Sequence, residues 1–164
     1  MNYASINKTD IANGPGVRVS LFVSGCRHHC PGCFNQSAWD FNYGIGFSKD
    51  TVNEILEAVG RNYISGLTIL GGEPFEPENL SLVRELCQTV KERYPDKTIW
   101  VYTGLLYEDI EKTTVMQFVD VLVDGPFIQS QKDLTLCFRG SRNQRIIDVQ
   151  KTRESGTIEL YIEE

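Results

Sequence analysis

Three cysteines lie within eight residues of one another, Cys26, Cys30 and Cys33, in the spacing Cys-x3-Cys-x2-Cys. Thiolates so close in sequence can bind one small inorganic group when the backbone loops around it, and iron–sulfur clusters use such soft ligands. A [4Fe–4S] cluster has four irons, so three cysteines leave one iron free to bind a small molecule. The spacing therefore favours a cluster at which chemistry takes place.

Two other interpretations of this stretch stay open. Cys30-Pro31-Gly32-Cys33 is a Cys-x-x-Cys sequence and could be a dithiol redox pair. Such pairs normally begin a helix in a thioredoxin-like unit, and this interpretation leaves Cys26 unexplained. A zinc site of three cysteines with His28 or His29 is also possible. Both histidines lie between cysteines only four residues apart, where reaching the same ion is cramped. We therefore expect them to be solvated loop residues or donors outside the ligand set.

Composition and charge indicate an ordinary globular protein. The 164 residues, 41% hydrophobic and 23% charged, suffice for one domain but fall short of the roughly 250 residues of a complete eight-fold βα barrel. The net charge of −6 argues against a nucleic-acid partner, and the lack of a long apolar run argues against a membrane span. No signal-peptide pattern begins the chain and the five cysteines are odd in number, so we expect a cytoplasmic protein, with Cys87 and Cys137 as structural thiols.

Apolar runs and helical periodicity alternate along the chain. Strands are predicted at residues 17–23, 66–70, 98–103 and 119–123. Helices are predicted between them, at residues 48–60, 77–94 and 106–112. Such alternation gives a parallel sheet with right-handed crossovers. The predicted fold class is therefore α/β, a single compact domain built as a partial, incomplete parallel βα barrel.

The two ends of the chain differ from this core. Residues 1–16 are polar and end in a Gly- and Pro-rich turn, so no regular element is assigned to them. Residues 13–126 are expected to form the core of a single domain that covers residues 1–164. The segment 127–164 is irregular, with a possible terminal hairpin that pairs residues 146–149 with residues 157–161.

Residues suited to ligand binding follow the predicted strands. Because parallel βα folds bind ligands at the carboxyl ends of their strands, we expect the loops there to converge. Two adjacent glycines allow close approach of backbone to a ligand, and the following glutamate can receive a cationic group. The aromatic residues of the loop 34–47 are expected to keep water from the site. The strand ends carry the three cysteines, then Gly71-Gly72-Glu73-Pro74, Thr103-Gly104 and Asp124-Gly125-Pro126.

The cysteine spacing followed by Gly71-Gly72-Glu73-Pro74 resembles the radical S-adenosylmethionine (SAM) enzymes. The segment Asn13-Gly14-Pro15-Gly16-x-Arg18 is similar to the opening motif of the glycyl-radical-enzyme activases in that superfamily. Further motifs resemble the anaerobic ribonucleotide reductase activating proteins: Cys30-Pro31-Gly32-Cys33-Phe34-Asn35, Trp39, Val123-Asp124-Gly125 and Arg139-Gly140-Ser141-x-Asn143-Gln144-Arg145. Two departures are Gly32, where many radical SAM enzymes have an aromatic residue, and Asn13, where other activases often have an acid.

The resemblance implies a role for each motif. Cys26, Cys30 and Cys33 would bind three irons of a [4Fe–4S] cluster, and the amino and carboxylate groups of SAM would bind the fourth. The backbone of Gly71 and Gly72 and the side chain of Glu73 would hold the methionine amino group. Phe34 is implied for the adenine. Thr103 and Asp124 are implied for the ribose or the wall of the mouth.

The resemblance also implies a partner. Reductive cleavage of SAM would give a 5′-deoxyadenosyl radical that takes a hydrogen atom from a glycine of the large subunit of an anaerobic ribonucleotide reductase. An electron donor such as a flavodoxin would supply the electron. Candidates for docking the reductase are Asn13, Gly14, Arg18, Arg139, Arg142 and Arg145.

Two other functions compete with this one. A short radical SAM enzyme acting on a small molecule would also fit a compact barrel, but it would not need the motifs at residues 13–18 and 139–145. A non-catalytic zinc-binding module would need only the cysteine stretch.

Overall fold

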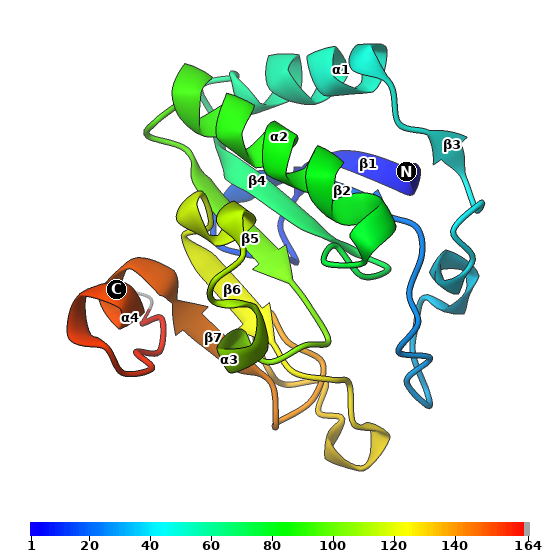
Figure 1. Cartoon of the computed structure of the whole chain (residues 1–164), viewed down its shortest axis with the longest axis vertical. Helices are drawn as coiled ribbons and strands as arrows, with labels where there is room; N and C mark the ends of the chain where they lie inside the picture. Colours follow the sequence, from blue (N-terminus) through cyan, green and yellow to red (C-terminus); the bar gives the residue numbers. More distant parts are fainter. Residues whose placement is uncertain (163–164) are drawn as a thin grey trace.

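The computed structural model describes residues 1–162, and within them a single compact α/β domain is built on one mixed seven-stranded sheet (Figure 1). The strand order is β3-β1-β2-β4-β5-β6-β7. The strands are β1 (Asn2–Asp10), β2 (Val17–Val23), β3 (Ile45–Gly46), β4 (Ile64–Gly71), β5 (Thr98–Tyr102), β6 (Val121–Asp124) and β7 (Arg145–Asp148).

The four strands predicted from sequence form the parallel centre of the sheet. β2, β4, β5 and β6 pair in parallel in that order, with Leu21 opposite Ile69, Ile69 opposite Val101, and Val101 opposite Leu122. The crossovers contain α1 (Lys49–Val59), α2 (Pro77–Arg93), and the short α3 (Tyr107–Ile110) with the 3-10 helix η2 (Thr114–Gln117). The predicted alternation of strands and helices is therefore confirmed.

The two faces of the parallel strands differ in composition, because successive side chains point to opposite sides of a sheet. The helix-covered face buries the cross-strand neighbours Leu21, Ile69 and Val101 in the main core, and Figure 1 shows α2 lying across β4. The opposite face is mixed. It buries Arg18 and Thr68, and it also carries a second apolar cluster of Trp100, Val121 and Val123.

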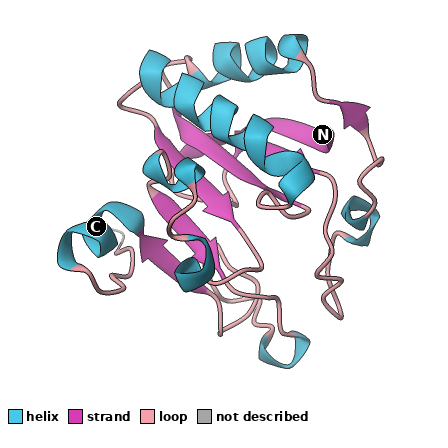
Figure 2. Cartoon of the chain, viewed as in Figure 1, coloured by secondary structure: helices cyan, strands magenta, loops and turns pink. Residues whose placement is uncertain are grey.

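The loops that follow the parallel strands gather at one end of the sheet (Figure 2). Among them are the short 3-10 helices η1 (Gln36–Trp39), after the cysteines, and η3 (Gln129–Gln131), after β6. Within the part of the chain that the structure describes, no helix has the length and apolar character needed to cross a membrane.

The N-terminal segment differs from the prediction, because residues 2–10 form strand β1. β1 pairs antiparallel with β2, with Ile6 opposite Leu21. The strand was not predicted because its sequence is largely polar. Alternate residues of β1 face solvent over most of its length. β1 in turn carries the two-residue strand β3 at the edge of the sheet.

The C-terminal hairpin is confirmed only in part. Residues 145–148 form β7, which pairs antiparallel with β6, and Ile147 forms an antiparallel bridge with Leu160. The residues between them do not make a tight turn, because Val149–Ser155 form the helix α4. The side chain of Asp148 accepts a hydrogen bond from the backbone of Lys151 and caps this helix.

Candidate iron–sulfur and cofactor site

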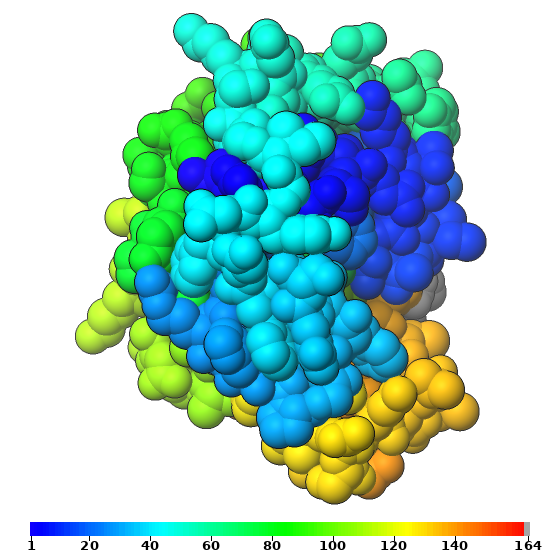
Figure 3. All heavy atoms as spheres, turned by 90° about the vertical axis from the view of Figure 1, so that its right-hand side faces the viewer, coloured from blue at the N-terminus to red at the C-terminus, as the bar shows by residue number. Residues whose placement is uncertain are grey.

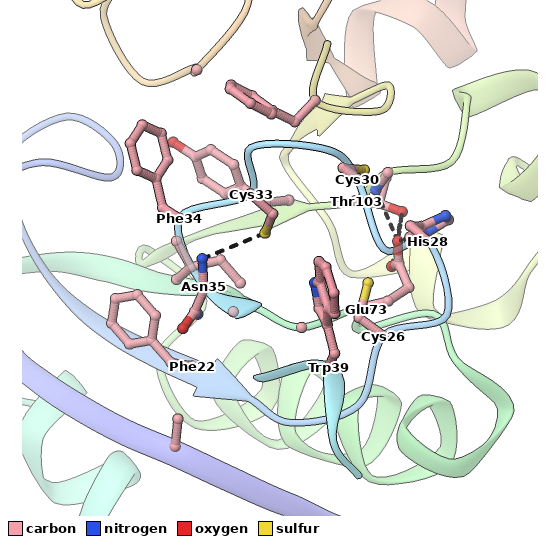
Figure 4. Close-up of a pocket in the computed structure, with 18 of the residues that line it drawn as sticks. Phe22, Cys26, His28, Cys30, Cys33, Phe34, Asn35, Trp39, Glu73 and Thr103 are labelled. Carbon is pink, nitrogen blue, oxygen red and sulfur yellow. Dashed lines mark hydrogen bonds and ion pairs between the residues drawn. The ribbon is translucent and has the colours of Figure 1, made fainter. Parts of the chain in front are cut away.

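A cavity of about 680 Å³ lies at the carboxyl ends of the parallel strands, and all three clustered cysteines line it (Figure 4). The strand pairing explains the convergence, since Val23 at the end of β2 lies opposite Gly71 at the end of β4. The cavity brings together nine of the residues predicted from sequence: Asn13, Cys26, Cys30, Cys33, Phe34, Gly71, Gly72, Glu73 and Thr103.

The three thiols are half-buried and free. Burial raises the pKa of Cys26 to about 11, and the Sγ atom of Cys33 accepts a hydrogen bond of 3.4 Å from the backbone of Asn35. In residues 1–162 no three histidine, cysteine or acidic side chains converge where one metal ion could bind. A [4Fe–4S] cube places each cysteine on a different iron, so its ligands do not need to converge on one point.

The segment after the cysteines folds back against the start of the cysteine loop. The backbone of Cys26 donates a hydrogen bond of 3.2 Å to the carbonyl of Trp39, and that of Gly25 donates one of 2.7 Å to Ala38. Gly25 has a φ of +101°, and a Cβ there would lie 2.3 Å from the ring of Phe41. Trp39 and Tyr43 line the cavity. Phe34 is 71% exposed and lies at its rim.

The loop after β6 closes another side of the cavity. The ring of Phe127 lies 5.8 Å from that of Phe34, centroid to centroid, and the Nζ atom of Lys132 lies 4.5 Å from the centre of the Phe34 ring. Figure 3 shows the light-blue and cyan surface around the cysteine loop bordering the yellow and orange surface of residues after β6. Two segments about 100 residues apart in the sequence thus share one rim.

Gly71, at the end of β4, packs against the backbone of β2, and Gly72 packs against the start of the cysteine loop. Gly71 has a φ of +107°, and a Cβ on it would lie 2.7 Å from backbone atoms of Val23. A Cβ on Gly72 would lie 2.6 Å from the carbonyl oxygen of Gly25. Side chains at either position would push the neighbouring segments apart, so these glycines fix the spacing between them as well as lining the cavity.

Glu73 is the centre of the polar contacts in the site, although its side chain is only 2% exposed. Its carboxylate accepts hydrogen bonds from the Oγ1 atom of Thr103 at 2.8 Å, the backbone of Gly104 at 2.8 Å and the backbone of Phe75 at 3.0 Å. The Nε2 atom of His28 lies 2.7 Å from its Oε1 atom. This contact with Glu73 raises the pKa of His28. One carboxylate therefore joins three loops.

Thr103 lines the cavity, and its side chain also binds Glu73. Its hydroxyl donates to both carboxylate oxygens of Glu73 and accepts a hydrogen bond from the backbone of Leu105. The side chain therefore orients Glu73, while the residue also lines the cavity. Contact with a ribose stays a prediction.

Two residues of the site were not assigned a role from the sequence. His28 was expected to be solvated or to donate from outside the ligand set, and nothing in the cysteine spacing indicates Glu73 as its partner. Asn79, in the first turn of α2, is buried, and its Nδ2 atom donates to the carbonyls of Ser24 and Glu73, both at 3.0 Å. A polar residue four positions before Val83, on the apolar side of the helix, is the signal that could have revealed it.

Asp124 and Arg145 bind each other and are not among the cavity-lining residues. The Nη2 and Nε atoms of Arg145 lie 2.6 and 3.0 Å from the carboxylate of Asp124, and Nη2 also reaches Glu108 at 2.9 Å. The backbone of Tyr107 donates to the same carboxylate at 2.8 Å. This ion pair holds β6, β7 and the start of α3 together. It gives no support to the cofactor role predicted for Asp124 or to the docking role predicted for Arg145.

Arg18 requires a correction, because it is fully buried and cannot contact a docked partner. Its guanidinium donates to the Oγ1 atom of Thr68 at 2.8 Å and to the carbonyls of Leu67 at 3.0 Å and Thr98 at 2.8 Å. Burial lowers its pKa to about 10. Gly14, with a φ of +127°, is buried against this side chain.

The other docking candidates lie nearer the surface. Arg142 is exposed, whereas Arg139 is half-buried and donates to the carbonyls of Arg142 at 3.0 Å and Gln144 at 2.6 Å, which holds its own loop together. Asn13 lines the cavity, and its Nδ2 atom lies 2.7 Å from the carboxylate of Asp10. Arg142 is the candidate with the freest side chain.

Two residues that line the cavity each carry a buried polar atom without a partner in the described part of the chain, which fits a bound group. Among the described residues, neither the Nε1 atom of Trp39 nor the hydroxyl of Tyr102 has a hydrogen-bond partner. Buried polar groups are normally paired, so a ligand that accepts hydrogen bonds would complete this wall. Together with three thiols and a glycine-lined loop, the donor set suits an iron–sulfur cluster with a polar cofactor beside it.

The fold and the cysteines define an α/β protein with a single-cluster iron–sulfur domain, and residues 12–147 match the family described as "4Fe-4S single cluster domain". The chain is 43% identical over 146 residues to the anaerobic ribonucleoside-triphosphate reductase-activating protein of Enterobacteria phage T4, covering 89% of this chain and 93% of that protein. The proteins of that name from Haemophilus influenzae and Escherichia coli K12 are 43% and 41% identical over 150 and 148 residues. These alignments cover 89% and 88% of this chain and 97% and 96% of the relatives. The chain belongs to the family of anaerobic ribonucleoside-triphosphate reductase-activating proteins.

Proposed function

We propose that this protein activates an anaerobic ribonucleoside-triphosphate reductase by radical SAM chemistry. Cys26, Cys30 and Cys33 hold a [4Fe–4S] cluster, and SAM occupies the cavity beside it. When bound, these groups supply the reductive cleavage of SAM and the removal of a hydrogen atom from a glycine of the reductase. The single observation that carries the proposal is that the three cysteines and the Gly71–Glu73 loop line one cavity, in a chain about 40% identical to named activating proteins.

The fold supports this proposal through the parallel strands β2, β4, β5 and β6, which place four loops around one mouth. In the proposed arrangement they serve as the incomplete barrel of a radical SAM domain, with residues 13–126 as its core. A short barrel leaves its mouth open, which a protein substrate requires. Ligand sites at this end of parallel strands are the general rule for such folds.

The residues of the chain supply placement and exclusion of water. Gly71 and Gly72 offer backbone groups to the methionine amino group, and Glu73 provides the negative charge that favours a cation nearby. Glu73 is held in place by its four donors, so its orientation is set before the cofactor binds. Phe34, at the rim of the cavity and in contact with Phe127, is the proposed contact for the adenine.

Exposed residues at the rim are the proposed contacts for the reductase. Arg142 is exposed, and Phe34 and Lys132 lie together where the cysteine loop meets the segment after β6. In this proposal an electron donor such as a flavodoxin reduces the cluster, and the protein works in the cytoplasm.

The test is anaerobic incubation of the protein with SAM, dithionite and the partner reductase. The proposal predicts a glycyl-radical doublet in the EPR spectrum of the reductase. The variant Cys30→Ala is predicted to lose both the cluster and the cleavage of SAM. Cleavage of SAM without a glycyl radical would instead favour a radical SAM enzyme that acts on a small molecule.

A further inference from the structure

Trp39 lies beside the cysteine loop, and its indole N–H has no acceptor within residues 1–162. Its side chain lines the same cavity as Cys26, Cys30 and Cys33, and its Nε1 atom is buried without a partner among the described residues. Its carbonyl accepts the hydrogen bond from the backbone of Cys26. Figure 4 shows the indole ring among Cys26, Cys33 and Glu73.

The ring is held in a fixed orientation. The imidazole of His29 stacks on it with 4.3 Å between ring centroids and an angle of 11° between the planes. His29 itself has a φ of +47°, which is uncommon for a residue with a side chain. The stack and the backbone contact together fix the position of Nε1 relative to the cysteine loop.

Two acceptor groups labelled around the ring in Figure 4 already have donors. The carboxylate of Glu73 accepts from four residues, and the Sγ atom of Cys33 accepts from the backbone of Asn35. An indole N–H can only donate, so its partner must offer a lone pair. The acceptor that completes this donor is therefore a group bound in the cavity.

We propose that the indole N–H of Trp39 donates a hydrogen bond to a bridging sulfide of the cluster. This inference rests on the proposed cluster site and adds a residue that changes the reduction potential of the cluster. Reduction makes the cluster more negative, so a hydrogen bond to its sulfur stabilises the reduced form more than the oxidised form. Such bonds are one of the ways in which proteins set cluster potentials. Trp39 thus makes the cluster easier to reduce.

The test compares Trp39→Phe with the wild-type protein, both prepared anaerobically with the cluster in place. Phenylalanine keeps an aromatic ring for His29 to stack on and removes the N–H. The midpoint potential is measured by redox titration followed by EPR, without SAM. We expect a more negative potential and changed g-values, at unchanged iron and sulfide content per chain.

Trp100→Phe is the matched control. Trp100 is buried on the same side of the sheet as Arg18, stacks edge-on against Phe138 and does not line the cavity. The same chemical change there is expected to leave the cluster potential as in the wild type. Equal shifts in the two variants would overturn the assignment, because they would report a general loss of packing.

A second measurement begins with the wild-type protein. Wild-type protein with 15N in its tryptophan indoles is predicted to show a nitrogen hyperfine coupling to the reduced cluster in pulsed EPR, which Trp100→Phe retains. An unchanged potential in Trp39→Phe, a shift seen only with SAM present, or the lack of this coupling would overturn the role of Trp39 alone. A wild-type protein that binds no cluster would overturn the proposed function together with this inference.

Discussion

The Nε2 atom of His28 lies 2.7 Å from the Oε1 atom of Glu73, which joins the cysteine loop to the loop after β4. The same carboxylate accepts from Thr103 and Gly104 after β5. A histidine between two proposed cluster ligands thus positions the residue proposed to face the amino group of SAM. The contact couples the cluster side of the cavity to its cofactor side.

Replacing His28 with alanine is expected to weaken SAM binding. Glu73 loses one donor and the cysteine loop loses its contact with the neighbouring loops, so both halves of the site become less ordered. We expect the KM for SAM to rise about tenfold, which corresponds to about 1.4 kcal/mol, with a smaller change in kcat. The measurement is the initial rate of SAM cleavage as a function of SAM concentration.

His28→Gln and His29→Gln are the controls for this variant. Glutamine can donate from a position close to that of Nε2, so His28→Gln should recover most of the affinity. His29 stacks on Trp39, whereas the histidine on Glu73 is His28, so His29→Gln should keep the KM for SAM near the wild-type value. Equal KM values for His28→Ala and the wild type would show that the contact has no positioning role.

Replacing Arg145 with alanine should destabilise the protein much more than replacing Arg142. Arg145→Ala leaves the buried carboxylate of Asp124 without its cation, and breaking a buried pair from one side costs about 3 kcal/mol. Arg142 is exposed, and Arg142→Ala should change the free energy of unfolding by less than about 0.5 kcal/mol. Urea unfolding followed by circular dichroism measures both. Comparable stability of the two variants would contradict the structural role of Arg145.

Arg142→Ala also has a functional consequence under the proposal. If the side chain contacts the reductase, the variant should form the same cluster and cleave SAM at the same rate in the absence of reductase. Its activation of the reductase should then need a higher concentration of the activating protein. Identical concentration dependence in the variant and the wild type would remove Arg142 from the docking surface.

The carboxylate of Asp10 should make the free energy of unfolding fall at acid pH. Burial alone would raise its pKa, but hydrogen bonds from Ser20 at 2.6 Å, Asn13 at 2.7 Å and the backbone of Ala12 hold the pKa below its ordinary value. A carboxyl with a lowered pKa stabilises the fold above its unfolded pKa, and this contribution is lost as the pH falls through the folded pKa. Asp10→Asn should therefore cost about 1 kcal/mol at pH 7.

The difference between Asp10→Asn and the wild type should shrink below about pH 4, where the unfolded carboxyl becomes protonated. Urea unfolding at pH 7 and at pH 3.5 tests this. A difference that stays constant between these two pH values would mean that the charge of Asp10 contributes nothing to stability.

The two cysteines outside the cavity should differ in reactivity. Burial raises the pKa of Cys87 to about 12, whereas Cys137 is exposed. Alkylating reagents attack the thiolate, so in the folded protein Cys137 should be modified first and Cys87 only after unfolding. Iodoacetamide treatment followed by mass spectrometry of the peptides measures both. Simultaneous labelling of the two would place Cys87 outside the core.

The parallel core was predictable because its strands are buried on both faces. Runs such as Val17–Val23 and Thr98–Tyr102 are rich in β-branched and aromatic residues, and the helices between them have a clear apolar face. The positions of the cysteines and of Gly71–Glu73 were predictable because parallel βα folds bind ligands at the carboxyl ends of their strands. What the sequence lacked was a signal for β1, whose exposed positions are polar, and for α4, which is seven residues long.

Contacts between side chains far apart in sequence were the part that sequence could not provide. Arg18 and Arg145 look like surface residues by type, and only the folded chain shows one inside the sheet and the other paired with Asp124. The same holds for His28, whose partner Glu73 is 45 residues away. Residue type indicates what a side chain can do, and the fold decides which partner it meets.

A cluster held by three cysteines, with one iron open to SAM, can be detected by iron and sulfide analysis together with EPR on the anaerobic, reduced protein. We expect about four irons and four sulfides per chain, and an EPR signal that changes when SAM is added. One zinc per chain, no iron, or a cluster signal that SAM leaves unchanged would contradict it.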